Sequence, residues 1–577
     1  MVLTGKEILA SFQKGQTHVQ IIKTTKGTQE KDDNSNSEES FALTPVISPA
    51  TNQPVCWLQP TTPNEINEIV QDAANALEQI IPGHAFTWSD VAAGPFRATV
   101  LQTWATLLRQ HVDTLARLEV QQIGRPYKEM RFQLGRLPEW FEYFAAIVLT
   151  HHDVVTPWKQ GSYQNVVTRV PLGVVAQITP FNHPLLITIK KLAPALAAGN
   201  AVVIKPSELA PVSILALVQL GHQAGVPPGI VNVILGGKSE VQHLIRHPVI
   251  AKVDFTGGPK AGRAIGAAAG ENLAAVTQEL GGKAPMIVCA PQHVEHLPKH
   301  VVNKEYLQPV VNGCVFGAFI ASGQTCIAGT RLLVDARWYQ DFLDRLVDKT
   351  KVFCLGDPLD LKTTIGPVIT RKQMDWIHKT LHDAVETGDG VMLRILCGGK
   401  PFQGLAGTQF ADGNYYEPTI VAVDSKWADQ MTTKGTDGDD KTAASEARKR
   451  VSSLHHTNAL FQTELFGPVV VVAPYMDDDH AIEMANDTPF GLGASIWSRD
   501  LMQAQALASK VKAGLCWVND HHKNHPSSPW GGLTKASGIG RENGKDAFLE
   551  YTQTKSIIMN CGPFTSDWFQ DPNARYN

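Results

Sequence analysis

The spacing of apolar residues predicts helices in the first part of the chain. Between residues 63 and 150, apolar side chains recur three or four positions apart, which is typical of amphipathic helices packed on another layer. The positions with this spacing are Ile66, Ile69, Val70 and Ala73, then Leu101, Trp104, Leu107 and Leu108. We expect ordered structure to begin near Val46.

Beyond Gly173, short apolar runs alternate with helical stretches. Strands are predicted over residues 173–179, 201–205, 231–235 and 252–256, and helices over 184–198 and 211–224, the first of them ending at Gly199. A second series of strands follows over residues 286–289, 330–334 and 469–472. This alternation predicts parallel sheets with helices on both faces, so we expect two α/β domains.

Three polar segments stand apart from this pattern. Residues 24–42 are polar and acidic, and residues 1–45 are predicted to form a flexible N-terminal arm. Residues 425–458 interrupt the second domain with a low-complexity run from Thr433 to Thr442. We expect a mobile or regulatory loop there, with at most a short surface helix from Ala443 to Val451. Residues 561–577 form a C-terminal tail.

Composition narrows the class of protein. The chain has 577 residues, 43% hydrophobic and 18% charged, as expected for a soluble protein of several domains. Its net charge of −4 gives no basic surface for nucleic acid, and no apolar run reaches the ~18 residues that span a bilayer. The N-terminus lacks the pattern of a secretory or transit signal. Eight scattered cysteines show neither metal spacing nor regular pairing, so we predict a cytoplasmic protein without a metal site.

Cys326 is the strongest candidate for chemistry. It ends the run Phe319-Ile-Ala-Ser-Gly-Gln-Thr-Cys326, a stretch of small and polar residues suited to a loop that presents one sulfur. A thiolate attacks carbonyl carbons well even when only a small fraction of the thiol is ionised. The alternative is a cysteine that packs in the interior as a small apolar side chain.

Polar residues near the predicted strand ends are further candidates. Asn182 opens a helix, where its amide could donate to a developing oxyanion or cap the helix. Lys205 and Glu208 follow a strand, where α/β sheets bind ligands, although they could also form a solvated ion pair. Glu279 precedes two glycines that allow close backbone approach. Burial would raise its pKa toward that of a general base, but it could also cap a helix or pair with a cation.

In chain order, these motifs resemble those of the NAD(P)-dependent aldehyde dehydrogenase superfamily, of the hydrolytic, non-acylating type. The similarity extends from about residue 46 to about residue 560. The motifs are Ile178-Thr-Pro-Phe-Asn182-His-Pro, Lys205-Pro-Ser-Glu208, Phe255-Thr-Gly-Gly-Pro-Lys-Ala-Gly262, Glu279-Leu-Gly-Gly-Lys-Ala-Pro285, the Cys326 run and Glu464-Leu-Phe466-Gly-Pro468.

The resemblance implies an α/β, aldehyde dehydrogenase-like fold. A Rossmann-type NAD-binding domain is expected over residues 46–147 and 171–285, and an α/β catalytic domain over 286–549. A protruding hairpin at 148–170 and a strand at 550–560 would be oligomerisation elements, so a homodimer or homotetramer is expected. Val154, Val155, Val166 and Val167 would supply strand edges for a partner subunit.

The resemblance also implies roles for residues. Cys326 would be the nucleophile, Asn182 and the Cys326 N–H the oxyanion hole, and Glu279 the general base. NAD is the implied cofactor, because the Glu208 carboxylate would repel the 2′-phosphate of NADP. The implied cofactor-binding residues are Ile178, Thr179, Phe181, Lys205, Ser207, Glu208, Gly237, Gly257, Gly258, Gly262, Leu280, Glu464 and Phe466. Two positions depart from the family: Gly258 replaces a serine and removes a phosphate contact, and Ala321 replaces an asparagine and alters loop rigidity.

A substrate tunnel is implied along the helix that follows Asn182. The residues expected to line it are His183, Leu186, Ile187 and Lys190, with Ile320 and Thr325 beside the thiol and Trp530 over it. Lys190 stands where the family often has an aromatic residue. It would favour substrates with a distal carboxylate or another polar group, unless it extends to solvent. The run His521-His-Lys-Asn-His525 is predicted to be a flexible surface loop rather than a metal site.

The predicted function is oxidation of an aldehyde to the carboxylic acid with NAD. The reaction would pass through a thiohemiacetal and a thioester on Cys326, which water hydrolyses with Glu279 as base. Two alternatives are a catalytically silent scaffold and a coenzyme A-acylating dehydrogenase. Silent relatives usually lose the cysteine or the glutamate, and acylating relatives lack the glutamate, whereas this chain keeps both. No nucleic-acid or membrane partner is expected.

Overall fold

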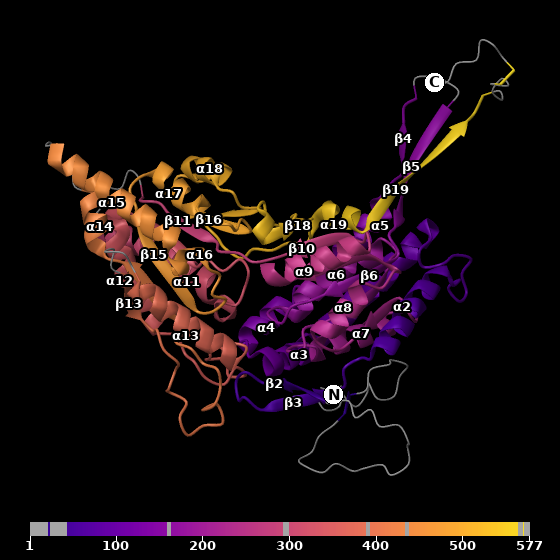
Figure 1. Ribbon diagram of the computed structural model, residues 1–577, viewed down its shortest axis with the longest axis horizontal. Helices are drawn as coiled ribbons and strands as arrows, with labels where there is room; N and C mark the ends of the chain where they lie inside the picture. Colours follow the sequence, from indigo (N-terminus) through magenta and orange to yellow (C-terminus); the bar gives the residue numbers. More distant parts are fainter. Residues whose placement is uncertain are drawn as a thin grey trace.

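Two large sheets covered by helices lie side by side, and a small sheet extends from one end (Figure 1). The computed structural model describes residues 21–22, 43–158, 163–291, 299–387, 393–432, 438–562 and 569–570. The first half of the chain builds most of one large sheet and the second half builds the other. The two α/β halves predicted from the strand–helix alternation are confirmed.

The first sheet has six strands in the order β18-β10-β9-β6-β7-β8, all parallel except β18. β6 and β7 are buried along their whole length. Their nearly continuous apolar sequences follow from this burial, because helices cover both faces of the sheet. The strands are β6 (Val174–Ile178), β7 (Ala201–Lys205), β8 (Val231–Val233), β9 (Ile250–Thr256), β10 (Ala275–Glu279) and β18 (Gly538–Ile539).

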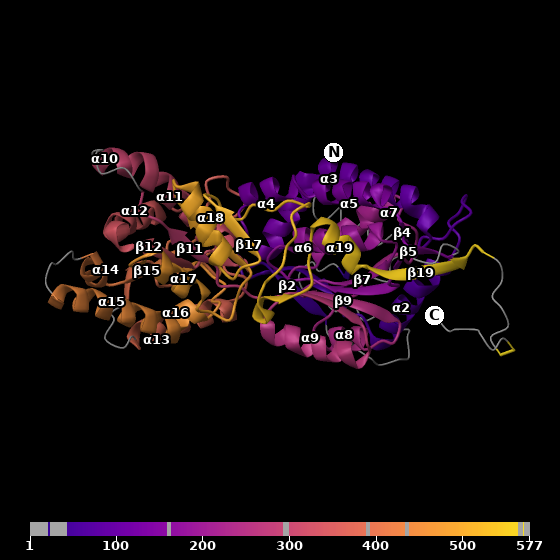
Figure 2. The same cartoon turned by 90° about the horizontal axis from the view of Figure 1, so that it is seen from above.

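Helices lie on both sides of this sheet, with α3, α5, α6 and α7 on one side and α8 and α9 on the other (Figure 2). The apolar positions predicted in α2 and α3 are buried, apart from the half-buried Leu107. α6 ends just before Gly199, whose φ of 92° is the left-handed conformation that commonly follows a helix. The helices are α2 (Pro63–Glu78), α3 (Gly94–Ile123), α4 (Tyr127–Leu134), α5 (Pro138–Thr150), α6 (Pro184–Ala197), α7 (Val212–Gln223), α8 (Lys238–Ile245) and α9 (Pro259–Glu271).

Near its end the chain returns to the first half. β18 pairs antiparallel with β10, and the following helix α19 (Gly544–Glu550) buries Ala547 and Phe548 in the first core. Gly538 permits the strand pairing, because a Cβ there would overlap the carbonyl of Gln278. Residues 538–549 therefore pack with the first half, and the expected extension of the catalytic domain to residue 549 is not what the packing shows.

The second sheet has seven strands in the order β13-β14-β15-β12-β11-β16-β17, all parallel except β13. The strands are β11 (Pro285–Val288), β12 (Arg331–Asp335), β13 (Leu393–Cys397), β14 (Thr419–Val423), β15 (Val469–Tyr475), β16 (Gly493–Trp497) and β17 (Leu515–Val518). The helices of this half are α10 (Lys299–Val302), α11 (Gln308–Phe319), α12 (Tyr339–Lys351), α13 (Arg371–Glu386), α14 (Ser425–Thr432), α15 (Gly438–Thr457), α16 (Ala459–Gln462), α17 (Asp478–Asn486) and α18 (Leu501–Lys510).

The insertion at residues 425–458 is largely helical, so the expectation of a structureless loop is wrong. α15 alone has 20 residues, far more than the short surface helix expected. It buries Ala447, Val451 and Leu454 in the second core. These positions are four and three residues apart and so lie on one face of the helix, and the burial of that face explains why the segment is ordered. Residues 433–437 lie outside the described part of the chain.

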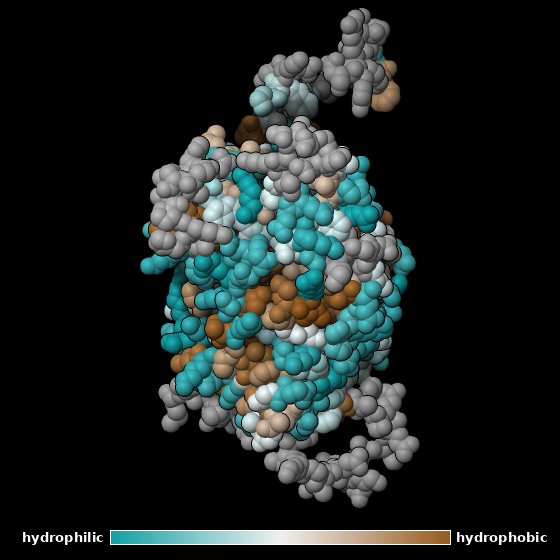
Figure 3. Space-filling model, turned by 90° about the vertical axis from the view of Figure 1, so that its left-hand side faces the viewer, coloured by the Kyte–Doolittle hydropathy of each residue, from teal (hydrophilic) through white to brown (hydrophobic). Residues whose placement is uncertain are grey.

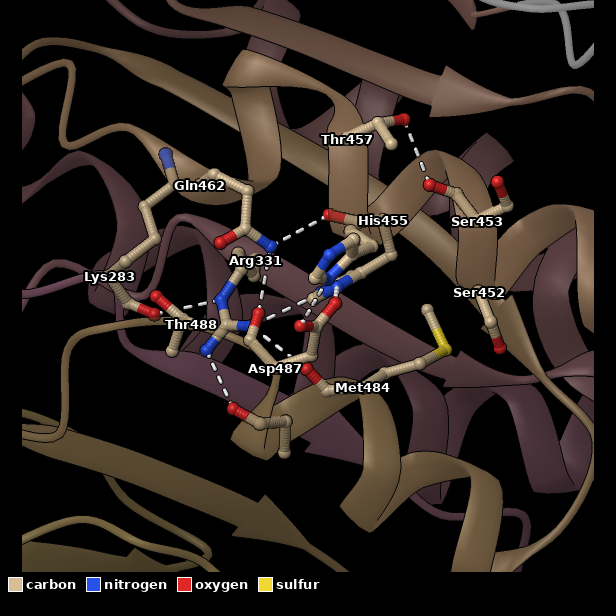
Figure 4. Close-up of polar contacts among 12 residues, drawn as sticks. Lys283, Arg331, Ser452, Ser453, His455, Thr457, Gln462, Met484, Asp487 and Thr488 are labelled. Carbon is tan, nitrogen blue, oxygen red and sulfur yellow. Dashed lines mark hydrogen bonds and ion pairs between the residues drawn. The ribbon is translucent and has the colours of Figure 1, made fainter.

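A buried polar network fastens α15 to the sheet (Figure 4). Arg331, at the start of β12, donates to His455 Nε2 (3.1 Å) and to the carbonyls of Met484 and Ala485 in α17 (3.0 and 2.9 Å). His455 Nδ1 lies 3.1 Å from Asp487, so the imidazole donates from Nδ1 and accepts at Nε2. Burial lowers the pKa of His455 to about 4, and the ring is therefore neutral.

The small sheet consists of β4 (Val154–Thr156), β5 (Tyr163–Pro171) and β19 (Thr552–Asn560), in the order β19-β5-β4. It extends away from both halves at the upper right of Figure 1. β19 pairs antiparallel with β5 along all nine residues. Val154 and Val155 on β4 are exposed, as are Ile557 and Ile558 on β19. The sheet thus presents apolar side chains to the outside of the molecule.

At the N-terminal end, β2 (Thr44–Ile47) and β3 (Pro54–Leu58) form a sheet with β1 (Ile21–Ile22). Described structure therefore continues from residue 43, close to the expected start. Of the predicted arm, Ile21 and Ile22 form β1, and Thr44 and Pro45 begin β2. The rest of the arm, to residue 42, and most of the predicted tail at 561–577 lie outside the described residues. No helix in the described segments is long and apolar enough to cross a membrane.

The end face formed by the second half is mostly hydrophilic around a central apolar patch (Figure 3).

A groove of about 470 Å³ lies between α12 and the sheet edge at β13. Its lining mixes apolar and charged side chains, among them Leu343, Val347, Asp348 and Arg394. None of the residues predicted for catalysis or cofactor binding lines this groove, so the candidate chemistry lies elsewhere.

Candidate active site

Cys326 follows a strained turn at the end of α11. Ala321, Ser322 and Gly323 take φ values of 55°, 53° and 70°, three successive left-handed residues. The turn is held from outside by Ser322 Oγ, which donates to the Gly366 carbonyl (2.8 Å), and by the Ile369 N–H, which donates to Gln324 (2.9 Å). Asparagine tolerates this conformation better than alanine does, so Ala321 makes the turn costlier.

The Cys326 thiol is half-buried beside an apolar cluster. It packs against the group formed by Ile327, Leu492, Trp517 and Trp530. Burial, and then the charges of nearby carboxylates, raise the pKa of the thiol to about 12, while the Lys190 ammonium opposes them. The thiol therefore carries its proton at neutral pH in the ligand-free protein and needs a base to become a nucleophile.

Asn182 is buried and points toward the Cys326 loop. Its Nδ2 donates to the carbonyl of Gln324 (2.9 Å), two residues before the cysteine. The N-cap of α6 is His183, without a side-chain cap, so the alternative in which Asn182 caps this helix is wrong. A side-chain amide has two N–H donors, and the one not used by Gln324 can serve another acceptor near the thiol.

Glu279 ends β10 in an apolar site. Its side chain is 2% exposed, and neither carboxylate oxygen has a hydrogen-bond partner among the described residues. The alternatives of a helix cap and an ion pair are therefore wrong. Burial, and then the Glu542 charge, hold the pKa of Glu279 well above its usual range, as expected for a base that works near neutral pH.

The paired glycines after Glu279 bring three segments together. A Cβ at Gly282 would overlap the Cys326 carbonyl, and a Cβ at Gly281 would overlap the Glu464 carboxylate. The Gly282 N–H donates to Glu464 Oε1 (3.0 Å). Burial raises the pKa of Glu464 to about 7. Only glycine at both positions lets the loops that carry Glu279, Cys326 and Glu464 pack this closely.

Two phenylalanines from distant motifs meet beside these loops. The rings of Phe181 and Phe466 lie edge to face, with centroids 5.8 Å apart. Phe466 has a φ of 53°, an uncommon value for a bulky residue, so its position is imposed by the surrounding structure. Both rings are half-buried, unlike ordinary core residues.

The ends of β6, β7 and β9 carry polar groups suited to a dinucleotide. Thr179 and Thr256 each have a buried hydroxyl with no hydrogen-bond partner among the described residues. Lys205 Nζ lies 3.3 Å from Glu208, whose side chain is half exposed beside a small pocket. Ile178 is buried next to this edge, and Ser207 Oγ accepts from the Leu209 N–H (3.3 Å).

The glycines expected at the pyrophosphate lie at two helix starts. Gly258 is the N-cap of α9, and a Cβ there would meet nothing within 4 Å, so the backbone is open to a ligand. Gly257 and Gly262 would each clash if they carried a Cβ, Gly262 with Leu280. Gly237 caps α8, and its N–H donates to Glu240 (2.7 Å). The open helix start, the free hydroxyls and the exposed carboxylate fit a dinucleotide.

One face of α6 carries the expected tunnel residues. His183, Leu186, Ile187 and Lys190 are spaced three and four residues apart and so share a face. Ile320 is half-buried and Thr325 buried, both close in sequence to Cys326. Lys190 is 3% exposed and pairs with Glu542 (2.6 Å), so the alternative in which it extends to solvent is wrong. Its Nζ lies 4.2 Å from the centroid of the Trp530 ring.

Buried charged residues near the site that were not predicted include Glu542, Lys191, Asp254 and Arg125. Glu542 also binds Lys191 (2.6 Å), which in turn pairs with Asp254. Arg125 contacts His183 Nδ1 (2.6 Å) and pairs with Glu129. Two adjacent lysines within the apolar run from Leu185 to Ala198 signalled buried cations. No sequence pattern indicated that their carboxylate partner, Glu542, lies 351 residues beyond Lys191.

The prediction that the run from His521 to His525 is a flexible surface loop is wrong. His521 is buried, and its Nε2 contacts the Ile327 carbonyl (2.7 Å), while His522 Nε2 contacts the Gly317 carbonyl (2.9 Å). Both rings are fixed against the helix and loop that carry Cys326, which explains their order. Of the three histidines, only His525 is exposed. Within the described residues, no group of three or more His, Cys, Asp or Glu side chains is arranged to hold a metal ion.

Comparisons with known proteins agree with this geometry. Residues 36–431 and 451–557 match the model of the aldehyde dehydrogenase family, and most of α15 falls in the unmatched gap. Phenylacetaldehyde dehydrogenase of Pseudomonas fluorescens is 34% identical over 525 residues, 89% of this chain and 92% of that protein. Betaine aldehyde dehydrogenase of Vibrio vulnificus is 34% identical over 534 residues, 92% of this chain and 96% of that protein.

A solved structure extends the likeness to three dimensions. Betaine aldehyde dehydrogenase from Staphylococcus aureus, crystallised in complex with NAD+, superimposes with a TM-score of 0.78 at 29% identity. The superposition covers 92% of this chain and 94% of that one. With a family match over most of its length and relatives at 34% identity, this chain belongs to the aldehyde dehydrogenase family.

Proposed function

We propose that this protein oxidises an aldehyde to the carboxylic acid with NAD, using Cys326 as nucleophile, Asn182 as oxyanion donor and Glu279 as general base. The observation that carries the assignment is the meeting of their three segments. Gly282 packs against the Cys326 carbonyl, and Asn182 donates to the carbonyl two residues before the thiol. A thiol, an amide donor and a desolvated carboxylate in one place are the parts that covalent aldehyde oxidation requires.

The reaction begins with transfer of the Cys326 proton to a base, for which Glu279 is the candidate. The sulfur then attacks the aldehyde carbon and forms a thiohemiacetal. The former carbonyl oxygen, now an oxyanion, accepts hydrogen bonds from Asn182 Nδ2 and the Cys326 N–H. One such donor contributes about 2.7–4 kcal/mol to stabilising the transition state. After the carbon is oxidised to the thioester, Glu279 releases the proton of the thiol to solvent and takes a proton from the attacking water. That proton passes to the Cys326 sulfur as the acid leaves, which restores the thiol.

The polar groups at the strand ends support NAD as the oxidant. When bound, the nicotinamide accepts the hydrogen and electron pair from the thiohemiacetal carbon. The cofactor phosphates and the neighbouring nicotinamide half of the molecule would be held by Thr179, Thr256 and the open start of α9. Glu464 would bind the nicotinamide ribose, and Phe466 would pack against the nicotinamide ring. Glu208 would accept from the adenosine ribose hydroxyls and repel a 2′-phosphate, which favours NAD over NADP.

We infer that the protein acts as a homodimer or homotetramer in the cytoplasm. The apolar side chains of the protruding sheet support self-association through β4 and β19. All eight cysteines are free thiols, which supports a reducing compartment. We likewise propose that the first sheet with residues 46–147 and 171–285 binds the cofactor, while residues 148–170 and 550–560 join subunits.

NADH formation from aldehydes, in the wild type and two variants, tests the proposal. Cys326→Ala should abolish oxidation and leave NAD affinity nearly unchanged, because the sulfur is the nucleophile and not a cofactor ligand. Glu279→Gln should lower the steady-state rate by ~10²-fold or more, the usual contribution of a general base. NAD affinity is measured by fluorescence titration of the same preparations.

The outcomes separate the alternatives. Substantial turnover by Cys326→Ala would refute the nucleophile assignment. A requirement for coenzyme A in wild-type turnover would identify an acylating dehydrogenase. No NADH from a panel of aliphatic and aromatic aldehydes, together with no NAD binding, would identify a silent scaffold.

A further inference from the structure

The tunnel face of α6 carries a cation that is already paired. Lys190 Nζ lies 2.6 Å from Glu542 Oε2, and Lys191 Nζ lies 2.6 Å from Glu542 Oε1, so both oxygens of this buried carboxylate are occupied by lysines. Lys191 is neutralised further by Asp254. Glu542 therefore has no oxygen left to bind a positively charged ligand, and Asp254 is already paired with Lys191.

The aromatic surface next to the thiol is occupied as well. Lys190 Nζ lies 4.2 Å from the centroid of the Trp530 ring, within range of a cation–π contact, and Trp517 meets the same ring edge to face at 6.3 Å. Backbone hydrogen bonds in both directions between Trp530 and Glu542 (2.7 and 2.8 Å) fix the ring relative to the carboxylate that holds Lys190. The ammonium, ring and carboxylate are thus one rigid unit.

This unit lies beside the reacting centre. Trp530 belongs to the apolar cluster against which Cys326 packs. The charge of Lys190 acts on both Cys326 and Glu279, which places the ammonium near both groups. A substrate held with its carbonyl carbon at the thiol would therefore present its first few atoms to Lys190 and Trp530.

We propose that Lys190 is a specificity-determining residue that makes this enzyme discriminate against aldehydes with a positive charge close to the carbonyl. Proteins bind quaternary ammonium groups on free aromatic faces and carboxylates, and here Lys190 itself takes the Trp530 face and a Glu542 oxygen. A cationic substrate would have to lose its water beside a buried like charge, which is costly. This inference rests on the proposed aldehyde oxidation and names the substrate class that the same site rejects.

The test uses two aldehydes of the same shape. Betaine aldehyde carries a trimethylammonium group on the carbon next to the carbonyl, and 3,3-dimethylbutanal carries an uncharged tert-butyl group there. Their intrinsic reactivities differ, so the readout is the change between variants in the ratio of kcat/KM for the neutral aldehyde to that for the cationic one. Lys190→Met and Lys190→Gln should lower this ratio at least tenfold relative to the wild type. Lys190→Arg, which keeps the charge, should leave it within about threefold.

Both neutral variants are made so that one that fails to fold does not end the test; folding is checked by thermal unfolding and NAD binding. A wild-type ratio that persists in a folded neutral variant would overturn the role of Lys190 while leaving the proposed function intact. A ratio that falls equally in Lys190→Arg would also overturn it, because shape rather than charge would then be responsible. No NADH from these two aldehydes or from the aldehyde panel in the wild type, together with no NAD binding, would instead contradict the proposed function itself.

Discussion

At the scale of single residues, the site is built from conformations that most residues avoid. Ala321, Ser322 and Phe466 all have positive φ values, and each such residue costs on the order of 1–3 kcal/mol. The left-handed turn at Ala321 and Ser322 is held by the hydrogen bonds that Ser322 donates and Gln324 accepts. Phe466 is held in its conformation by packing on Phe181. The strain fixes the direction in which the Cys326 backbone N–H and sulfur face the site.

The protonation of Cys326 gives a prediction about pH. Its pKa is raised to about 12, chiefly by burial, so the fraction of thiolate should increase tenfold for each pH unit across the neutral range. Without dinucleotide, the rate of iodoacetamide alkylation at Cys326 should therefore rise about a thousandfold from pH 6.5 to pH 9.5. Mass spectrometry of the Cys326 peptide measures this rate, with exposed Cys354 in the same sample as reference for the reagent. A plateau below pH 8.5 would show that the thiol ionises far more easily than its surroundings imply.

The sequence offers candidates for the reactive residues more readily than it reveals their surroundings. Asn182, Glu279 and Cys326 could be picked out because their residue types suit one reaction and each lies in a distinctive short motif. Lys190 was noticed, but its pairing was not predictable, since Glu542 approaches it only after the chain has built the second half and returned. Partners separated by hundreds of residues are set by the fold, and a single sequence does not reveal them.

At the scale of secondary structure elements, α15 is the part of the molecule that the family does not explain. It lies largely outside the matched residues, yet Ala447, Val451 and Leu454 fill the second core. Their spacing was present in the sequence as a helical pattern. The low-complexity run from Thr433 to Thr442 that precedes them favours a loop, so the sequence predicts only a short surface helix over Ala443–Val451. By contrast, the buried strands were predictable from their continuous apolar runs.

The network around His455 predicts how α15 is held. His455→Ala should lower the stability of the second half by about 2–4 kcal/mol, because Arg331 loses an acceptor in the interior and the ring leaves a cavity beside Phe461. His456→Ala is the matched control: the neighbouring histidine binds the same Asp487 but is 72% exposed, so stability should hardly change. Urea unfolding at pH 7.5, followed by tryptophan fluorescence, compares the variants.

Lowering the pH should reduce the difference in the free energy of unfolding between the wild type and His455→Ala. His455 has a pKa of about 4 in the folded protein and about 6.5 when unfolded, so the unfolded state binds more protons between these values. The wild type therefore loses the stability contributed by His455 as pH falls from 6.5 toward 4, whereas the alanine variant has none of it to lose. Equal effects of His455→Ala and His456→Ala at pH 7.5 would contradict the proposed anchoring role of His455.

At the scale of the whole molecule, the final residues connect parts that are far apart in sequence. After β17 the chain crosses back, adds β18 to the first sheet, supplies Glu542 to Lys190 and Lys191, and then extends as β19 along β5. The division into two α/β halves could be predicted from strand–helix alternation. The crossing could not, because β18 has only two residues and carries no recognisable strand pattern.

The protruding sheet gives a prediction about assembly. Ile558 is 55% exposed on β19, where it lies among other exposed apolar residues of the described chain, Ile557 and Met559. Burying such a side chain in an interface contributes about 1.5–3 kcal/mol to the free energy of association. In a two-fold interface both subunits carry the substitution, so this contribution is lost twice. Ile558→Lys should therefore weaken self-association at least 100-fold, measured by sedimentation velocity over a range of concentrations. Thr554→Lys, on the same face of the same strand near its packed end, is the control and should stay assembled. If Ile558→Lys sediments like the wild type at every concentration, β19 does not join subunits and its apolar surface needs another explanation.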